Sequence, residues 1–194
     1  MKYEINSTTY YRVSSLRTPN NITEIKDYAL YGLWHLTSIT IIKIPKSITS
    51  IGEYAISGCT KLATVEYPST AETTDEHIFD GSEPMTTIKI VGSGATQTYT
   101  DNKQPWNTVM TLIQNVEFDS TITSVGNYAF KGASSLTKIT WGGVKSIGDY
   151  AFTNCTGFTS LSFLKYACPS YKGVSPLNFI IAISYIGCIV IFIS

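Results

Sequence analysis

Charge is scarce in this sequence, and the two signs balance. Charged residues make up 14% of the 194 residues, and 14 lysines and arginines are matched by 14 aspartates and glutamates, so the formal net charge is zero. The chain has no block of basic residues of the kind that binds nucleic acid or an anionic membrane. We therefore expect no nucleic-acid partner.

Metal-binding and catalytic side chains are also few. The four cysteines form no C-x-x-C pair, and no histidine lies at a spacing suited to zinc. The only two histidines, His35 and His77, cannot be paired with a nucleophile and an orienting acid. The Gly-x-Gly at 92–94 lacks the third glycine and the following helix of a dinucleotide fingerprint. We expect no enzymatic activity, no cofactor and no metal.

The two ends of the chain give opposing indications about export. Residues 1–20 lack the apolar segment of a signal peptide, whereas residues 177–193 contain no charge. As a helix, this C-terminal run would extend about 26 Å, slightly short of the roughly 30 Å hydrocarbon core. We expect it to be helical and to lie outside the repeat core. It is either a membrane anchor or sequence read past the true repeat region.

The sequence does contain a two-part motif repeated along its length. The first part reads I-x-x-[IV]-G-x-Y-A-[FI], with a looser copy from Ile22, a worn copy at 73–79 and clear copies from Ile48, Ile122 and Val144. The second part reads L-x-x-I-x-[IFYW] and begins at Leu36, Leu62, Met85, Ile113, Leu136 and Phe158. A repeat of 20 to 50 residues is typical of solenoid proteins.

Each copy of the second part predicts a short strand with one buried face, because apolar and polar residues alternate and β-branched and aromatic types dominate. A single repeat cannot bury its own apolar face, so we expect six such strands to stack into a parallel sheet. The Y-A-[FI] segment predicts a turn or a single helical turn. Residues 92–112 replace one return segment and predict an irregular insert pinned by Tyr99 and Trp106.

These motifs resemble the BspA-like leucine-rich repeat family of surface proteins over roughly residues 22–163. The strings ITSIGEYAISGCTKLATV at 48–65 and GSGATQTYTDNKQPW at 92–106 carry the resemblance. We expect a mainly β leucine-rich-repeat solenoid of about six short parallel strands with turn or short helical return segments, followed by a C-terminal hydrophobic helix. Residues 1–165 would form the repeat domain, and residues 166–194 a linker and the hydrophobic segment.

The resemblance implies an exported adhesion or recognition module at a cell surface, whose ligand is a host, matrix or other cell-surface protein. Membrane anchoring would come from residues 177–193. Two alternatives remain, namely a β-helical enzyme acting on polysaccharide and a degenerate repeat fragment. The repeat alignment offers few of the acidic or basic groups that such an enzyme would align on one face.

The outward face of the strands is the best candidate for partner contact. Glu66, Lys89 and Glu117 place a cation between two anions, which predicts a surface ion-pair ladder worth about 1 kcal/mol or less. The predicted contact residues form two rows: Ser38, Thr64, Thr87, Asn115, Lys138 and Ser160, and then Thr40, Glu66, Lys89, Glu117, Thr140 and Ser162.

Cys59 and Cys155 occupy the same repeat position, several repeats apart. Because strands of neighbouring repeats lie about 4.8 Å apart, their Cα separation should exceed the roughly 7 Å that a disulfide can span. We expect two buried thiols that form no disulfide with each other. Cys168 and Cys188 lie outside the repeats, and no pairing is predicted for them.

Overall fold

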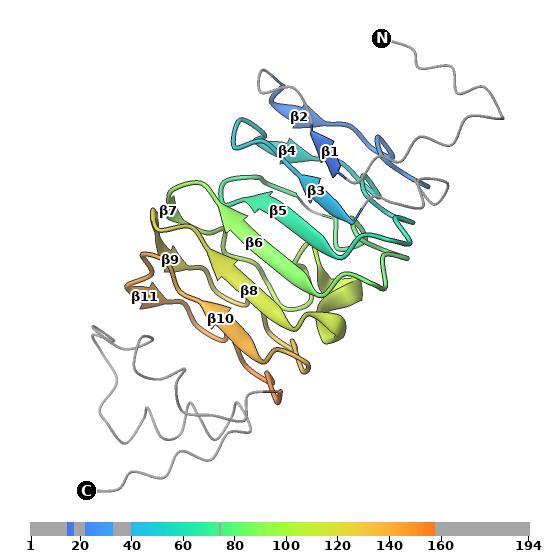
Figure 1. The fold of residues 1–194 in the computed structure, drawn as a ribbon. Helices are drawn as coiled ribbons and strands as arrows, with labels where there is room; N and C mark the ends of the chain where they lie inside the picture. The colour runs from blue at the N-terminus through green and yellow to red at the C-terminus, as the bar shows by residue number, and fades with distance from the viewer. Residues whose placement is uncertain (1–14, 18–21, 33–39, 74, 158–194) are drawn as a thin grey trace, which may run out of the picture.

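The computed structural model describes residues 15–17, 22–32, 40–73 and 75–157 (Figure 1). Within these residues the chain winds as a solenoid of about five turns, mainly β with little helix. We call each turn a rung. The fold class predicted from the repeats is therefore confirmed for the solenoid, whereas the predicted helix at 177–193 lies outside the described residues.

One side of the solenoid is a six-stranded parallel sheet, the main sheet. Its order is β1 (Ser15–Arg17), β3 (Ile41–Lys43), β5 (Thr64–Pro68), β6 (Thr87–Val91), β8 (Asn115–Phe118) and β10 (Lys138–Thr140). Neighbouring strands belong to successive rungs, so Val65, Ile88 and Val116 stand side by side. All three are fully buried and form one column of the core.

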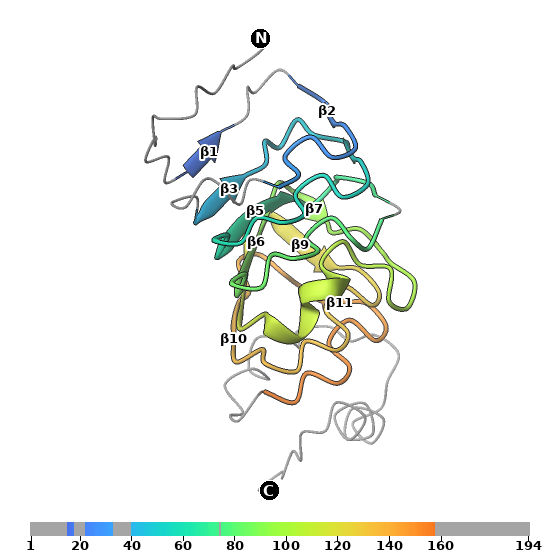
Figure 2. The same ribbon diagram turned by 90° about the vertical axis from the view of Figure 1, so that its right-hand side faces the viewer.

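Shorter parallel strands line a second side of the solenoid (Figure 2). They form two groups, β2 (Glu24–Ile25) with β4 (Ser50–Ile51), and β7 (Gly94–Ala95) with β9 (Ile122–Val125) and β11 (Ser146–Ile147). A bridge between Ser50 and Glu72 extends the first group by one rung. The motif I-x-x-[IV]-G thus supplies β2, β4, β9 and β11, whereas Glu72 and β7 take this place in the two rungs between them.

The glycine of the motif is required because the backbone of the preceding rung passes very close to it. A Cβ added at Gly52 would lie 2.4 Å from the Asp27 backbone nitrogen, and one added at Gly126 would lie 2.0 Å from the Gln97 carbonyl oxygen. Both distances are well inside van der Waals contact, so only glycine lets adjacent rungs stack at this position.

The turn that follows the glycine is the same in several rungs. Backbone N–H groups of Tyr28 and Leu30 donate to the carbonyls of Glu53 and Ala55, at 2.9 and 2.7 Å. A second pair of rungs repeats this pattern, and Phe130 there donates to Ala151 at 2.7 Å. The Y-A-[FI] segment therefore forms the predicted turn, with each rung hydrogen-bonded to the next.

The worn copy at 73–79 still forms a rung. Ile78 and Phe79 are fully buried, like their counterparts in the intact copies. The carboxylate of Asp75 accepts the Tyr54 backbone N–H at 2.7 Å and the His77 backbone N–H at 3.1 Å. This carboxylate takes the place of the backbone carbonyl that receives the tyrosine N–H in other rungs.

The insert at 92–112 is less irregular than predicted, because it contains β7 and a 3₁₀ helix, η2 (Asn107–Leu112). Trp106 is 2% exposed, and its ring stacks on Phe130 at a centroid distance of 5.1 Å. Tyr99 meets Trp106 edge-on at 5.9 Å. The indole Nε1 also donates to the Ala129 carbonyl at 2.8 Å. Trp106 thus continues the aromatic column that the motif phenylalanine forms in later rungs.

Two further predictions concern the cysteines and the membrane. Cys59 and Cys155 are both buried, as predicted, and their Sγ atoms lie 3.8 and 3.3 Å from the carbonyl oxygens of Leu30 and Phe130 in the preceding rung. In the described ranges, no helix has both the length and the apolar character needed to cross a bilayer.

Candidate functional site: the outer face of the main sheet

The register of the main sheet sets which outward side chains stand side by side. Thr64, Thr87, Asn115 and Lys138 occupy consecutive strands in one row. Glu66, Lys89, Glu117 and Thr140 form the second row in the same way. Both rows have the order predicted from the repeats, over the four rungs from β5 to β10.

The first strand of the repeat was placed wrongly from the sequence. Ile41 and Lys43 of β3, rather than Ser38 and Thr40, stand opposite Thr64 and Glu66. The reason is burial: Ile42 and Ile44 are 1% and 3% exposed and continue the core columns, so the strand lies three residues later than the L-x-x-I match.

The remaining predicted positions fall outside these rows. Thr40 precedes β3, and its carbonyl accepts the backbone N–H groups of Ala63 and Thr64 at 2.9 and 3.0 Å. Ser38, Ser160 and Ser162 lie outside the described residues, as does the strand predicted from Phe158. The sixth strand of the sheet is instead β1, at the N-terminal side, which the sequence did not predict.

Ion pairs run across the second row. Lys43 Nζ lies 2.6 Å from Glu66 Oε1, and Lys89 Nζ lies 3.1 Å from Glu117 Oε2. The predicted ladder is confirmed for Lys89 and Glu117. Glu66 instead pairs with Lys43, which the shifted register had hidden. Because these groups are partly exposed, each pair contributes about 1 kcal/mol or less.

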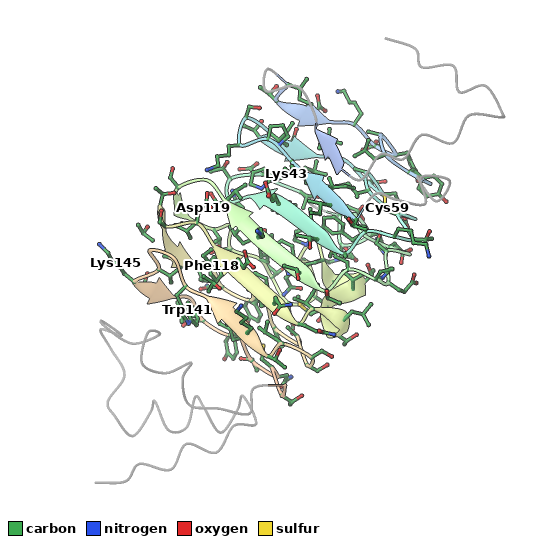
Figure 3. All side chains as sticks on the ribbon, viewed as in Figure 1. Lys43, Cys59, Phe118, Asp119, Trp141 and Lys145 are labelled. Carbon is green, nitrogen blue, oxygen red and sulfur yellow. The ribbon has the colours of Figure 1, made fainter. Side chains whose placement is uncertain are left out.

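A third ion pair lies beyond the C-terminal ends of the strands. Lys46 Nζ reaches Asp119 Oδ2 at 2.8 Å, although β5 and β6 separate their rungs. Figure 3 shows Lys43 and Asp119 toward this edge of the sheet. The hydrogen bond from Lys46 lowers the pKa of Asp119 below its ordinary value, outweighing the opposing effect of partial burial. Asp119 is therefore ionised at neutral pH.

The charged residues surround an open depression of about 320 Å³. Val91 and Phe118 form the apolar part of its lining. Its charged lining residues are Lys46, Glu66, Lys89, Glu117 and Asp119. Neither Lys46 nor Asp119 was predicted as a site residue. They belong to rungs that are far apart in the sequence and meet only in the folded chain, so no local sequence pattern marks the pair.

The repeats identify the family. The sequence matches the family described as "BspA type Leucine rich repeat region" in six copies, over residues 3–100 and 109–170. The chain belongs to the BspA-type leucine-rich repeat family. Leucine-rich repeats of this type are generally non-enzymatic scaffolds that bind proteins. No curated protein matches this BspA-type sequence.

Solved structures of leucine-rich repeat proteins resemble this BspA-type chain at low identity. One from Eubacterium ventriosum is 21% identical with a TM-score of 0.47, covering 76% of this chain and 37% of that one. A leucine rich cell surface protein from Faecalibacterium prausnitzii is 17% identical with a TM-score of 0.44, and the match covers 84% of this chain and 36% of that one. A T. pallidum leucine-rich repeat protein is 18% identical with a TM-score of 0.42, and the match covers 82% of this chain and 86% of that one. The chain spans less than half the length of the first two proteins.

Proposed function

We propose that this chain is a non-enzymatic recognition or adhesion module at a cell surface, and that it binds a protein ligand through the outer face of the main sheet. The observation that carries the proposal is the open depression on that face, whose lining combines charges of both signs with Val91 and Phe118. Such a hollow offers charge complementarity to a partner, and the polar, solvent-accessible part of a protein interface carries groups of this kind.

The same geometry disfavours polysaccharide cleavage at this site. A glycosidase needs one carboxylic acid that stays protonated and donates its proton to the leaving group. Here Glu66, Glu117 and Asp119 each lie within 3.1 Å of a lysine nitrogen. The lowered pKa of Asp119 keeps that group charged and unable to act as a general acid.

The first row adds neutral hydrogen-bonding groups beside the charges. Thr64, Thr87 and Asn115 follow one another across the sheet, and the Asn115 side-chain amide donates to the Thr87 hydroxyl at 3.3 Å. A ligand that lies across the rungs meets hydroxyls and amides in one row and alternating charges in the next. The charged row would guide association and select the partner more than it would raise affinity.

A binding screen with the whole chain tests the proposal. The chain would be tested against immobilised extracellular matrix proteins, beside a glycan-cleavage assay on the same preparation. We expect saturable binding to at least one protein and no cleavage. Cleavage without protein binding would refute the proposal, and absence of both with a folded chain would favour a repeat fragment without independent function.

The double variant Lys89→Ala with Glu66→Gln locates the interaction on the main sheet. We expect it to weaken binding about tenfold, because truncating interface charge pairs commonly costs this much or more. Lys61→Ala is the matched control, since Lys61 is an exposed lysine outside the strands. Equal loss in the control would place the contact elsewhere.

Antibody labelling of intact cells, which should stain the chain without permeabilisation, tests the surface location.

A further inference from the structure

The motif tyrosine adopts a backbone conformation that is unusual for a bulky residue. Tyr28, Tyr54, Tyr128 and Tyr150 have φ values of 57°, 51°, 59° and 58°. This left-handed region favours glycine and asparagine, and a non-glycine residue there carries an energetic penalty. Because the same aromatic ring recurs at this strained position, we infer that the ring makes contacts that a smaller residue could not make.

In the N-terminal rungs these rings form a continuous stack, the tyrosine–histidine stack, defined as Tyr28, Tyr54 and His77. Tyr28 and Tyr54 are parallel within 6° at a centroid distance of 5.4 Å, and Tyr54 and His77 lie at 5.2 Å and 15°. Tyr31 meets Tyr28 edge-on at 5.5 Å. Tyr28 and Tyr31 are 52% and 58% exposed, so aromatic surface is open to solvent here.

Three carboxylates, those of Glu53, Asp75 and Asp80, act electrostatically on Tyr54 of this stack. Glu53 and Asp80 are exposed, and within the described part of the chain neither carboxylate is in an ion pair. Partial desolvation raises the pKa of Tyr54, and the negative charges of Asp75, Asp80 and Glu53 raise it further. The stack therefore lies in a negative field that favours a cation.

A second stack in the same chain already holds a cation. Tyr128 and Tyr150 are parallel within 19° at 5.0 Å, in the same motif position. Lys131 Nζ lies 5.7 Å from the centre of the Tyr128 ring and forms an ion pair with Asp101. One cation thus contacts an aromatic face and a carboxylate together. Among the described residues, no lysine or arginine takes the equivalent place at the tyrosine–histidine stack.

We propose that the tyrosine–histidine stack, with Glu53 and Asp80, binds arginine side chains of a basic segment in a partner protein. The planar guanidinium group stacks on aromatic faces and pairs with carboxylates through two parallel hydrogen bonds, so it satisfies both features of this surface. The surface is built by the turns, not by the main sheet, and the proposal is therefore independent of the ligand-binding face proposed above.

A labelled hexa-arginine peptide, titrated into the full chain at low salt and followed by fluorescence anisotropy, tests the assignment. We expect saturable binding that is several-fold tighter than that of hexa-lysine, because lysine lacks the planar fork. Equal affinity for the two peptides would overturn the assignment to arginine. Absence of saturable binding would overturn the proposal.

Variants with matched controls locate the site. The double variant Glu53→Gln with Asp80→Asn keeps side-chain size, and we expect it to weaken binding about tenfold by removing two partners of the cation. Asp149→Asn is its control, because Asp149 is exposed and occupies the position of Glu53 beside the other stack. We expect the control to stay within about twofold of the unchanged chain. Equal loss in both would show non-specific charge attraction and overturn the proposal.

Tyr28→Ala tests the aromatic contribution, with Tyr150→Ala as its control at the same motif position and similar exposure, 52% against 58%. We expect about a threefold loss for the first, as an exposed cation–π contact would give, and little change for the second. Far-UV circular dichroism would verify that both variants are folded. Loss of hexa-arginine binding in Glu66→Gln instead would place the peptide on the main sheet and overturn the assignment.

Discussion

Replacing Trp106 by alanine should separate the insert at 92–112 from the core. The indole is 2% exposed, stacks on Phe130 and meets Tyr67 edge-on at 5.3 Å. Truncating a buried tryptophan costs about 3–5 kcal/mol because the space it leaves collapses only partly. Loss of its hydrogen bond to the Ala129 carbonyl adds about 1 kcal/mol. We therefore expect the free energy of unfolding to fall by about 4–6 kcal/mol.

Trp106→Phe separates the two contributions. Phenylalanine keeps an aromatic ring in the stack but cannot donate to Ala129, so we expect a loss of about 1–2 kcal/mol. Thr108→Ala is the control within the same insert, because Thr108 is exposed in η2 and its truncation should change stability by less than about 0.5 kcal/mol.

Urea unfolding followed by far-UV circular dichroism measures these differences without relying on the fluorescence of the residue that is removed. A typical domain has only about 5–15 kcal/mol of stability, so Trp106→Ala should shift the midpoint to much lower urea or leave a partly unfolded chain. A loss of less than about 1.5 kcal/mol with an unchanged m-value would refute the reasoning that Trp106 completes the aromatic column.

Three further substitutions each test a single contact. Gly126→Ala forces a methyl group against the Gln97 carbonyl, and we expect a loss of about 1–3 kcal/mol in urea unfolding; unchanged stability would show that the rungs can separate freely. Asp119 has a lowered pKa, so its ion pair stabilises the fold above the unfolded carboxyl pKa of about 3.9 and is lost as pH falls through the folded pKa. Lys46→Ala should therefore raise the pKa of Asp119 in an NMR titration, and an unmoved titration would contradict the pairing. Asp75→Ala leaves backbone N–H groups without their acceptor and should cost about 2–4 kcal/mol, with faster amide hydrogen exchange in that turn; unaltered exchange would argue against its structural role.

Local sequence pattern was sufficient for the repeating parts of the fold. The main-sheet strands β5, β6, β8 and β10 appear where period-2 alternation predicts them, since Val65, Ile88 and Val116 must all face the same core. The anchoring of the insert was also predictable, because Tyr99 and Trp106 are the two aromatic residues of positions 92–112. Burial of apolar side chains at a fixed spacing is a property of the chain itself.

The first rung shows where this reasoning fails. Residues 36–41 and 39–44 both satisfy an apolar alternation, so the pattern alone could not choose between them. The choice is made by the neighbouring rung, which pairs Ile41 with Thr64 and brings Lys43 beside Glu66. Register depends on the fit between two strands, and neither strand carries that information by itself.

The composition of the candidate surfaces was decided by the tertiary structure for the same reason. Glu66, Lys89 and Glu117 were readable as a row because the repeat spacing aligns them. Lys46 and Asp119 are 73 residues apart, and they meet only because the solenoid brings the ends of β3 and β8 to the same edge. The repeat sequence by itself determined the stacking of rungs and the burial of the core, since both follow from residue type at a regular interval. Only the tertiary structure decided which exposed charges and rings lie together, because contacts between distant rungs depend on register and on the path of every turn between them.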